Sequence, residues 1–70
     1  MDIEQFSRQR MCELMTEKSY SAYGIVKLSG FSGSTVRNYL HGRSALNPVF
    51  LDSFCRIVGI SLSEFYEGYE

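Results

Sequence analysis

The sequence has little of several residue types that define common classes of protein. Its 70 residues include no tryptophan, one proline and one histidine. No apolar run approaches the roughly 20 residues that a membrane-spanning helix needs, so we expect no membrane segment. The start of the chain, MDIEQFSRQR, is polar, with Asp2 and Glu4 at its beginning, and it lacks the apolar stretch of a signal peptide, which indicates a cytoplasmic protein.

Metal ligands and catalytic groups are equally sparse. Cys12 and Cys55 stand far apart, and His41 has neither a cysteine nor a second histidine near it. Metal sites need several such ligands at short spacing, so we expect no metal and no cofactor. The two cysteines are expected to act as small buried apolar side chains in a reducing compartment. No nucleophile and base stand at a recognisable spacing, and we therefore expect no enzymatic activity.

The overall composition is that of a small globular domain. Hydrophobic residues make up 44% of the chain, aromatic residues 14% and charged residues 21%. That balance favours folding over disorder. The length predicts one domain over residues 1–70, with a single small core.

Acidic residues are missing from the middle of the chain. The net charge is −1, which by itself argues against a nucleic-acid partner. Yet residues 18–51 contain no aspartate or glutamate. The same stretch contains four basic side chains and the histidine, namely Lys18, Lys27, Arg37, Arg43 and His41. Two interpretations remain open: chance clustering, or one electropositive face on an otherwise acidic protein.

Apolar spacing and capping residues predict five short helices and no strand. The expected ranges are residues 3–16, 22–29, 33–41 and 48–58, followed by a last helix that begins at residue 62. Side chains that accept hydrogen bonds from free helical N–H groups precede four of them, at Ser21, Ser32, Asn47 and Ser61. Glycines follow three of them, at Gly30, Gly42 and Gly59. The expected fold class is therefore all-α.

The aromatic residues and one side of each helix are expected to form the core. The aromatic core set is Phe6, Phe31, Tyr39, Phe50, Phe54 and Phe65. The helix over residues 22–29 is expected to add Ile25, Val26 and Leu28.

Four tyrosines are open to two interpretations each. Tyr20 and Tyr23 flank the Ser21 cap, and they either pack on the first helix or reach a phosphate group with a hydroxyl. Tyr66 and Tyr69 either form an apolar dimer surface or pack the last helix onto the core.

The helices over residues 22–29 and 33–41, with the turn that starts at Gly30, have the layout of a helix-turn-helix unit. In such a unit the second helix reads bases in the major groove, and the first crosses the phosphate backbone. The outward face of the second helix carries Gly33, Ser34, Arg37, Asn38 and His41. Glycine and serine are small enough for close entry, arginine matches guanine and asparagine matches adenine. The helix starts capped by Ser21 and Ser32 favour phosphate.

Three pieces of the sequence carry a family resemblance. They are Leu14, the pattern S-x-x-x-I-V-x-x-S-G-F-S-x-S-T-V-x-x-Y-L-x-G over residues 21–42, and GISLSEF over residues 59–65. With them, residues 10–67 resemble the Cro/C1-type helix-turn-helix domain, the XRE family of bacterial and phage regulators. The resemblance implies a lambda-repressor-like fold, with the motif at about residues 21–42. It places the base-reading positions at Gly33, Ser34, Arg37, Asn38 and His41.

Phosphate contacts are expected around the same motif. The candidates are Ser21, Ala22, Tyr23, Lys27, Ser32, Arg43 and Ser44, with Lys18 as a further one. Ala22 stands where the family often has a glutamine that touches DNA, so its expected contact is reduced to a main-chain N–H on phosphate.

A second departure concerns Met15 and Leu40. Family members often pair an arginine in the first helix with a glutamate near the end of the third, and here both positions are apolar. Losing one partner alone would leave a buried charge at a cost of about 3–5 kcal/mol, whereas replacing both can be neutral. The joint change predicts that the first and third helices still contact each other.

These features predict a sequence-specific regulator that binds double-stranded DNA, most simply a repressor. One helix reads too few base pairs for a unique site, so a homodimer on half-sites about 34 Å apart is expected. The alternative is a protein-interaction module, such as an antitoxin-like component, whose main role is to bind a partner protein with the face of the third helix.

Overall fold

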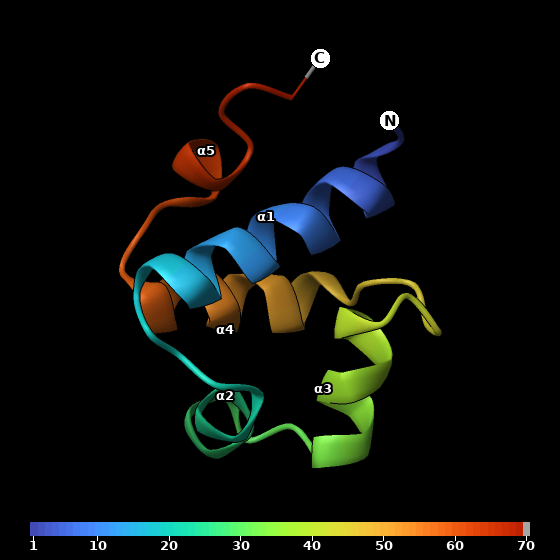
Figure 1. The fold of residues 1–70 in the computed structure, drawn as a ribbon, viewed down its shortest axis with the longest axis vertical. Coiled ribbons are helices and arrows are strands. Elements are labelled where there is room, and N and C mark those ends of the chain that lie inside the picture. Colours follow the sequence, from blue (N-terminus) through green and yellow to red (C-terminus); the bar gives the residue numbers. More distant parts are fainter. Residues whose placement is uncertain (70) are drawn as a thin grey trace.

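The computed structural model describes residues 1–69 as five α-helices, with no strand in that range (Figure 1). The helices are α1 (Ile3–Glu17), α2 (Ala22–Ser29), α3 (Gly33–Leu40), α4 (Pro48–Val58) and α5 (Leu62–Phe65). The predicted all-α class is confirmed. The predicted ends differ from the observed ones by one residue at the end of α1 and at the end of α3.

Side-chain caps start the helices where the sequence predicts them. The Oγ atoms of Ser21 and Ser32 accept hydrogen bonds from Gly24 N at 3.0 Å and Thr35 N at 3.2 Å. Asn47 caps α4 and Ser61 caps α5 in the same manner. A further cap was missed by the sequence reasoning: Asp2 and Gln5 form a capping box at the start of α1. The D-x-x-Q spacing is the signal that could have found it.

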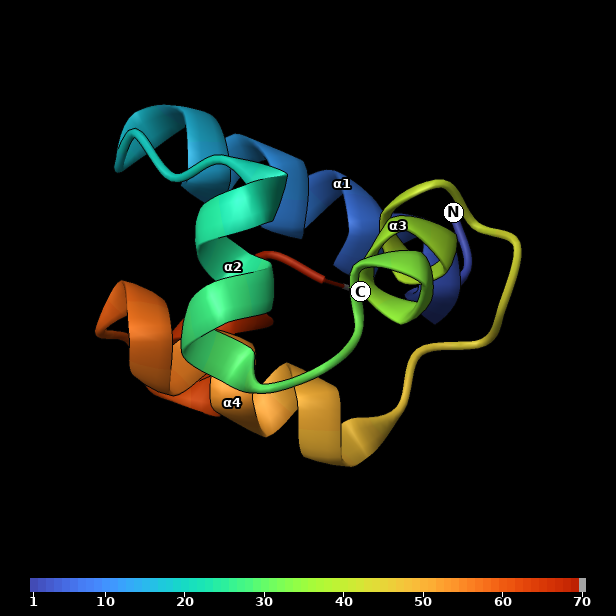
Figure 2. The same ribbon diagram turned by 90° about the horizontal axis from the view of Figure 1, so that it is seen from below.

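The connection between α2 and α3 consists of residues 30–32. Gly30 has φ +77° and its N–H donates to Val26 O, so the helix ends in a left-handed residue that a side chain would strain. The chain then changes direction sharply. In Figure 1 α2 is viewed along its axis while α3 runs vertically in the plane of the page. In Figure 2 α3 is viewed along its axis and α2 runs vertically. The axes of α2 and α3 therefore cross steeply.

An aromatic cluster forms the centre of the core. Phe50 is fully buried, with its ring centroid 4.8 Å from that of Tyr39 and 5.2 Å from that of Phe31. Phe54 continues the cluster along α4 toward Phe65 of α5. The remaining buried apolar residues come from α1 to α4 and are Met11, Leu14, Ile25, Val36, Leu51, Cys55 and Val58.

Three predicted core positions are wrong. Leu28 is 61% exposed. Residues two apart on a helix do not share a face, and α2 turns Val26 toward the core, so Leu28 points away. Cys12 is also exposed, because α1 buries the line of Ser7, Met11 and Leu14 at i, i+4 and i+7.

The third correction concerns Phe6, which lies outside the buried cluster. It is half-buried and packs against the two C-terminal tyrosines instead, with ring centroids 6.0 Å from Tyr66 and 5.1 Å from Tyr69. The Tyr66 hydroxyl also hydrogen-bonds the buried Ser7 Oγ at 2.7 Å. Of the two interpretations of Tyr66 and Tyr69, the geometry supports packing of the segment around α5 onto α1.

A charged side chain of α1 also holds α5. The Arg10 guanidinium donates to Phe65 O at 3.2 Å and to Glu64 O at 3.5 Å. It therefore satisfies the Phe65 carbonyl, which lies at the C-terminal end of this four-residue helix, whereas Glu64 O also accepts from Glu67 N at 3.3 Å. None of the helices in residues 1–69 is both long enough and apolar enough to cross a membrane.

The Tyr66–Ser7 hydrogen bond gives a stability prediction. Tyr66→Phe removes a hydroxyl that pairs with a buried Ser7 Oγ, so the free energy of unfolding should fall by about 1 kcal/mol. The matched control is Tyr23→Phe, because Tyr23 is 70% exposed and its change should stay within about 0.5 kcal/mol. Urea unfolding followed by circular dichroism measures both variants. Equal losses would contradict this role for the hydroxyl.

Candidate nucleic-acid interface

The candidate interface is built on α3, which is fixed by its inward side. Val36 is fully buried and Tyr39 is 7% exposed, so the opposite side of the helix faces solvent. Of the five predicted base-reading residues, the exposed ones are Ser34, Arg37 and His41, which stand at i, i+3 and i+7. They form one continuous line along the helix.

The other two base-reading candidates are half-buried. Gly33 is the first residue of α3, and Asn38 lies beside the exposed line with its main-chain oxygen accepting a hydrogen bond from Arg43 N at 2.9 Å. The Arg37 side chain runs back along the helix, so that its guanidinium lies over Gly33. The line of functional groups therefore begins at the first turn of α3.

The predicted phosphate contacts are distributed over α2, the start of α3 and the segments after α1 and α3. Ser21 and Ser32 are exposed, and their Oγ atoms cap α2 and α3. On α2 the Lys27 ammonium lies 5.6 Å from the centroid of the Tyr23 ring, and both side chains are exposed. Ala22 is half-buried at the start of α2, whereas Arg43 and Ser44 are exposed after α3 and Lys18 is exposed after α1.

Of the two roles considered for Tyr20, the structure contradicts the phosphate contact. Its hydroxyl donates to Ile57 O of α4 at 3.1 Å, and its ring packs against the core. The hydroxyl is therefore committed within the chain. Tyr20 ties the end of α4 to the connection between α1 and α2.

A groove of about 420 Å³ brings part of the predicted site together. It runs between the second half of α1, the start of α2 and the end of α3. Its lining includes Ser21 and Ala22 from the phosphate set and Arg37 and His41 from the base-reading set. The other members of both sets lie outside it. No acidic residue lines the groove.

The apolar pair predicted to link α1 and α3 also lies in this groove. Met15 and Leu40 both line it, and both are partly buried against the core. The predicted contact between the two helices is confirmed, since α1 and α3 pack against each other.

The loop after α3 is held by an interaction that the sequence reasoning missed. The Glu4 carboxylate accepts a hydrogen bond from Leu46 N at 3.3 Å and pairs with Arg8 at 3.1 Å. Arg8 lies against Gly42, where a Cβ atom would be only 3.0 Å from the Arg8 Nε. The i, i+4 spacing of Glu4 and Arg8 signals the ion pair, but nothing local signals the contact with Leu46.

The ion pairs leave the cations of the central segment free. Both pairs found in residues 1–69 use arginines outside α2 and α3, namely Arg8 with Glu4 and Arg56 with Asp52. Hydrogen bonds from Ser61 and, as a smaller contribution, the charge of Lys18 lower the pKa of Glu64, so Lys18 acts on an acidic side chain. Burial raises the pKa of the Cys55 thiol. Within residues 1–69, Lys27, Arg37 and Arg43 thus have no acidic partner, which favours an electropositive face.

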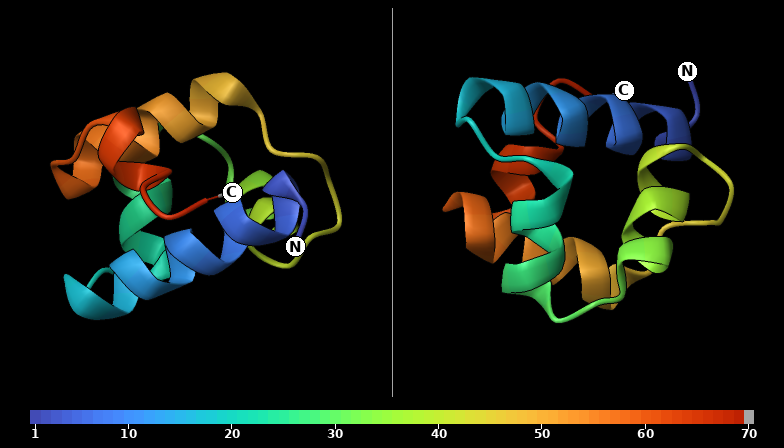
Figure 3. Two further views of the ribbon diagram at one scale, coloured as in Figure 1. Left: turned by 90° about the horizontal axis from the view of Figure 1, so that it is seen from above. Right: turned by 60° about the horizontal axis from the view of Figure 1, so that its bottom comes forward.

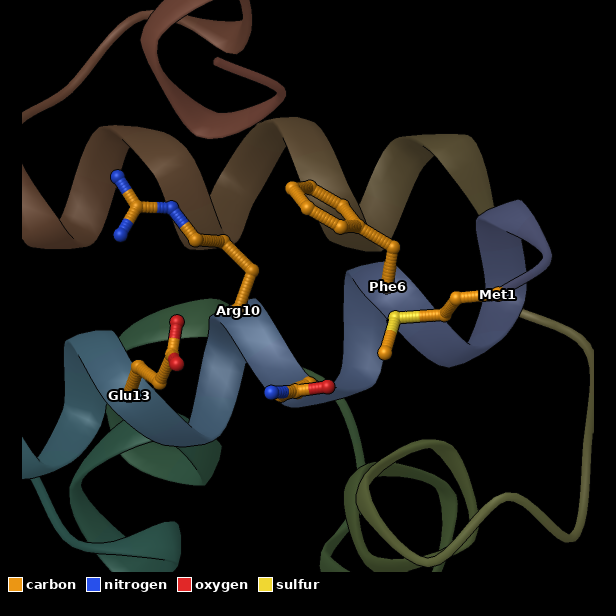
Figure 4. A pocket seen from close by; sticks show the side chains of 5 residues that line it. Met1, Phe6, Arg10 and Glu13 are labelled. Carbon is orange, nitrogen blue, oxygen red and sulfur yellow. The ribbon is translucent and has the colours of Figure 1, made fainter. Parts of the chain in front are cut away.

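A second hollow lies beside the first half of α1 (Figure 4). It is lined by Met1, Phe6, Gln9, Arg10 and Glu13, and it contains none of the predicted site residues. Arg10 is already engaged with α5. Within residues 1–69 no three histidine, cysteine or acidic side chains gather where they could hold a metal ion.

The arrangement of α2 and α3, the exposed line along α3 and the free cations define the candidate interface. Comparison of the chain with protein-family models, with curated proteins and with solved structures gives no match in any of the three.

Proposed function

We propose that this chain is a sequence-specific regulator of transcription that binds double-stranded DNA as a homodimeric repressor, with α3 in the major groove. The observation that carries the proposal is the exposed line of Ser34, Arg37 and His41 on a helix whose opposite side is buried. It lies in a segment without acidic residues, from residue 18 to residue 51.

The relation of α2 to α3 supports a helix-turn-helix motif of the Cro/C1 type. Two helices of eight residues each are joined by a short turn at a left-handed Gly30, and their axes cross steeply (Figures 1 and 2). These are the features of the motif. In that arrangement the start of α2 faces the phosphate backbone and α3 enters the groove.

The chemistry of the exposed line fits base recognition. Arg37 carries the planar pair of donors that matches guanine O6 and N7, and Asn38 carries the amide that matches adenine. Gly33 and Ser34 are small residues, so the first turn of α3 can approach the bases in the major groove closely. Lys27 and Arg43 are exposed and have no ion-pair partner within residues 1–69, so they are free to neutralise phosphates.

The homodimer is the second element of the proposal. An apolar groove lies at the starts of α1, α4 and α5, and none of its lining residues belongs to α2 or α3. Its apolar lining includes Ile3, 50% exposed, and Leu62, 51% exposed. The turn between α2 and α3 lies at the opposite end of the molecule from the N-terminus (Figure 3). A second copy on this groove would leave both α3 helices available for two half-sites.

The partner-protein alternative also has an observation in its favour. Met15 and Leu40 add apolar surface to the groove beside Arg37, and DNA phosphates would not bind to apolar surface. A protein-interaction module would bind its partner with this apolar surface together with Arg37 and His41. The salt dependence of duplex binding separates the two functions.

The first functional prediction concerns binding itself. Selection from random duplex DNA should return one sequence as two symmetric half-sites, and affinity for it should fall steeply with salt, with a slope near −0.9 for each phosphate neutralised. Fluorescence anisotropy over a salt series measures that slope. Duplex binding that is undetectable at about 50 mM salt would rule out the proposal and favour the partner-protein alternative.

The second prediction separates base reading from phosphate contact. Arg37→Ala should cost about 1–3 kcal/mol on the selected site and relax the preference at one base pair. Arg43→Ala, with the same change of charge, should weaken binding to all sequences similarly and lower the salt slope by about one. Measuring both variants on the selected site and on its single-base substitutions tests the assignment. It fails if the two variants behave alike.

The third prediction concerns the dimer groove. Leu62→Glu should shift the protein toward monomer in sedimentation equilibrium, because a charge at an apolar contact between copies is not compensated. Leu28→Glu is the matched control, since Leu28 is 61% exposed but belongs to α2 and lies outside that groove. A wild-type protein that stays monomeric on operator DNA would contradict this part of the proposal.

A further inference from the structure

The guanidinium of Arg37 occupies the space that a side chain at position 33 would need. A Cβ atom built on Gly33 would lie 3.1 Å from Arg37 Nη1, 3.6 Å from Nη2 and 3.7 Å from Cζ. All three contacts are with the same guanidinium group, and the first is shorter than an ordinary van der Waals contact. The long side chains of a helix point toward its N-terminus, so Arg37 reaches the first turn of α3 from its fifth residue.

We propose that Gly33 is a positioning residue for Arg37. Because Gly33 has no Cβ, the guanidinium of Arg37 can lie over the first turn of α3 and act there beside Ser34. This position is one turn closer to the N-terminus of the helix than the Arg37 Cα atom. This inference rests on the proposed DNA-binding function. It assigns a specific role to a glycine that is otherwise only a small residue at the entry of the helix.

The position of Arg37 is permitted by Gly33 rather than held by attraction. No hydrogen bond or ion pair within residues 1–69 engages the guanidinium. The first turn of a helix is also the positive end of its dipole, where a cation gains nothing. With a methyl group at position 33, the group that yields is therefore the exposed end of Arg37, which would have to move off the first turn by a few tenths of an ångström.

The chain offers a matched glycine for comparison. Gly24 also lies in the first turn of an eight-residue helix and also has an ordinary negative φ. A Cβ atom there would meet only Ser21 Oγ, at an unstrained 3.5 Å. Alanine favours helix more than glycine does, so Gly33→Ala and Gly24→Ala should both keep or raise the melting temperature. Only the former should displace an arginine.

The test is a double-mutant cycle on the selected duplex and its single-base substitutions. Gly24→Ala should keep the wild-type preference. Gly33→Ala should measurably reduce the discrimination at the base pair that depends on Arg37, which for one intact bidentate contact is roughly 5- to 150-fold. In an Arg37→Ala background, Gly33→Ala should change nothing further. Unchanged discrimination in Gly33→Ala, or a loss that adds to that of Arg37→Ala, would overturn the inference.

A measurement on the free protein separates this inference from the proposed function. Nuclear Overhauser contacts between the Arg37 side chain and Gly33 Hα should appear in the wild-type protein and in Gly24→Ala. If the wild type binds duplex DNA but these contacts are missing, only the role of Gly33 fails. If the contacts are present but no duplex is bound at low salt, the DNA-binding function fails and this role fails with it.

Discussion

The packing of Tyr39 against Phe50 is the contact on which the rest of the molecule depends. Helix α3 has eight residues, too few to be stable alone in water. It exists because Val36 and Tyr39 bury their side chains and the Tyr39 ring lies 4.8 Å from that of Phe50. That contact fixes which side of α3 is buried. It therefore also fixes which residues face solvent.

The two ends of α3 are held by different means. At its start, Ser32 caps the helix and Gly30 lets the chain turn away from α2. Beyond its end, the Glu4 carboxylate holds Leu46 N and Arg8 lies against Gly42. The following loop is thereby tied to α1, in addition to the hydrogen bond from Arg43 N to Asn38 O of α3. A rigid helix with an anchored loop behind it can present side chains with little entropy left to lose on binding.

The sequence predicts those parts of this fold that are encoded locally. Helix positions follow from apolar spacing, and the caps at Ser21, Ser32 and Asn47 follow from residue type, because both depend on neighbours within four residues. The exposure of Leu28 and Cys12 was predicted wrongly, since it depends on how α2 and α1 are rotated against the other helices.

Apart from the α1–α3 contact predicted from Met15 and Leu40, the contacts between residues far apart in the chain were not predictable. The Ser7–Tyr66 hydrogen bond joins positions 59 residues apart, and the Glu4–Leu46 bond joins positions 42 apart. In the candidate site, the exposed line on α3 follows from helical periodicity. The placement of the Arg37 guanidinium over Gly33 depends on a side-chain rotamer that no sequence pattern specifies.

The central claim is that the solvent-facing side of α3 contacts DNA bases. The most direct measurement is a ¹⁵N-labelled titration of the protein with the selected duplex, following backbone and arginine side-chain signals by nuclear magnetic resonance. The account predicts the largest changes at Ser34, Arg37 and His41, with smaller ones at Lys27 and Arg43. Changes confined to other helices, or no change at saturating duplex, would contradict it.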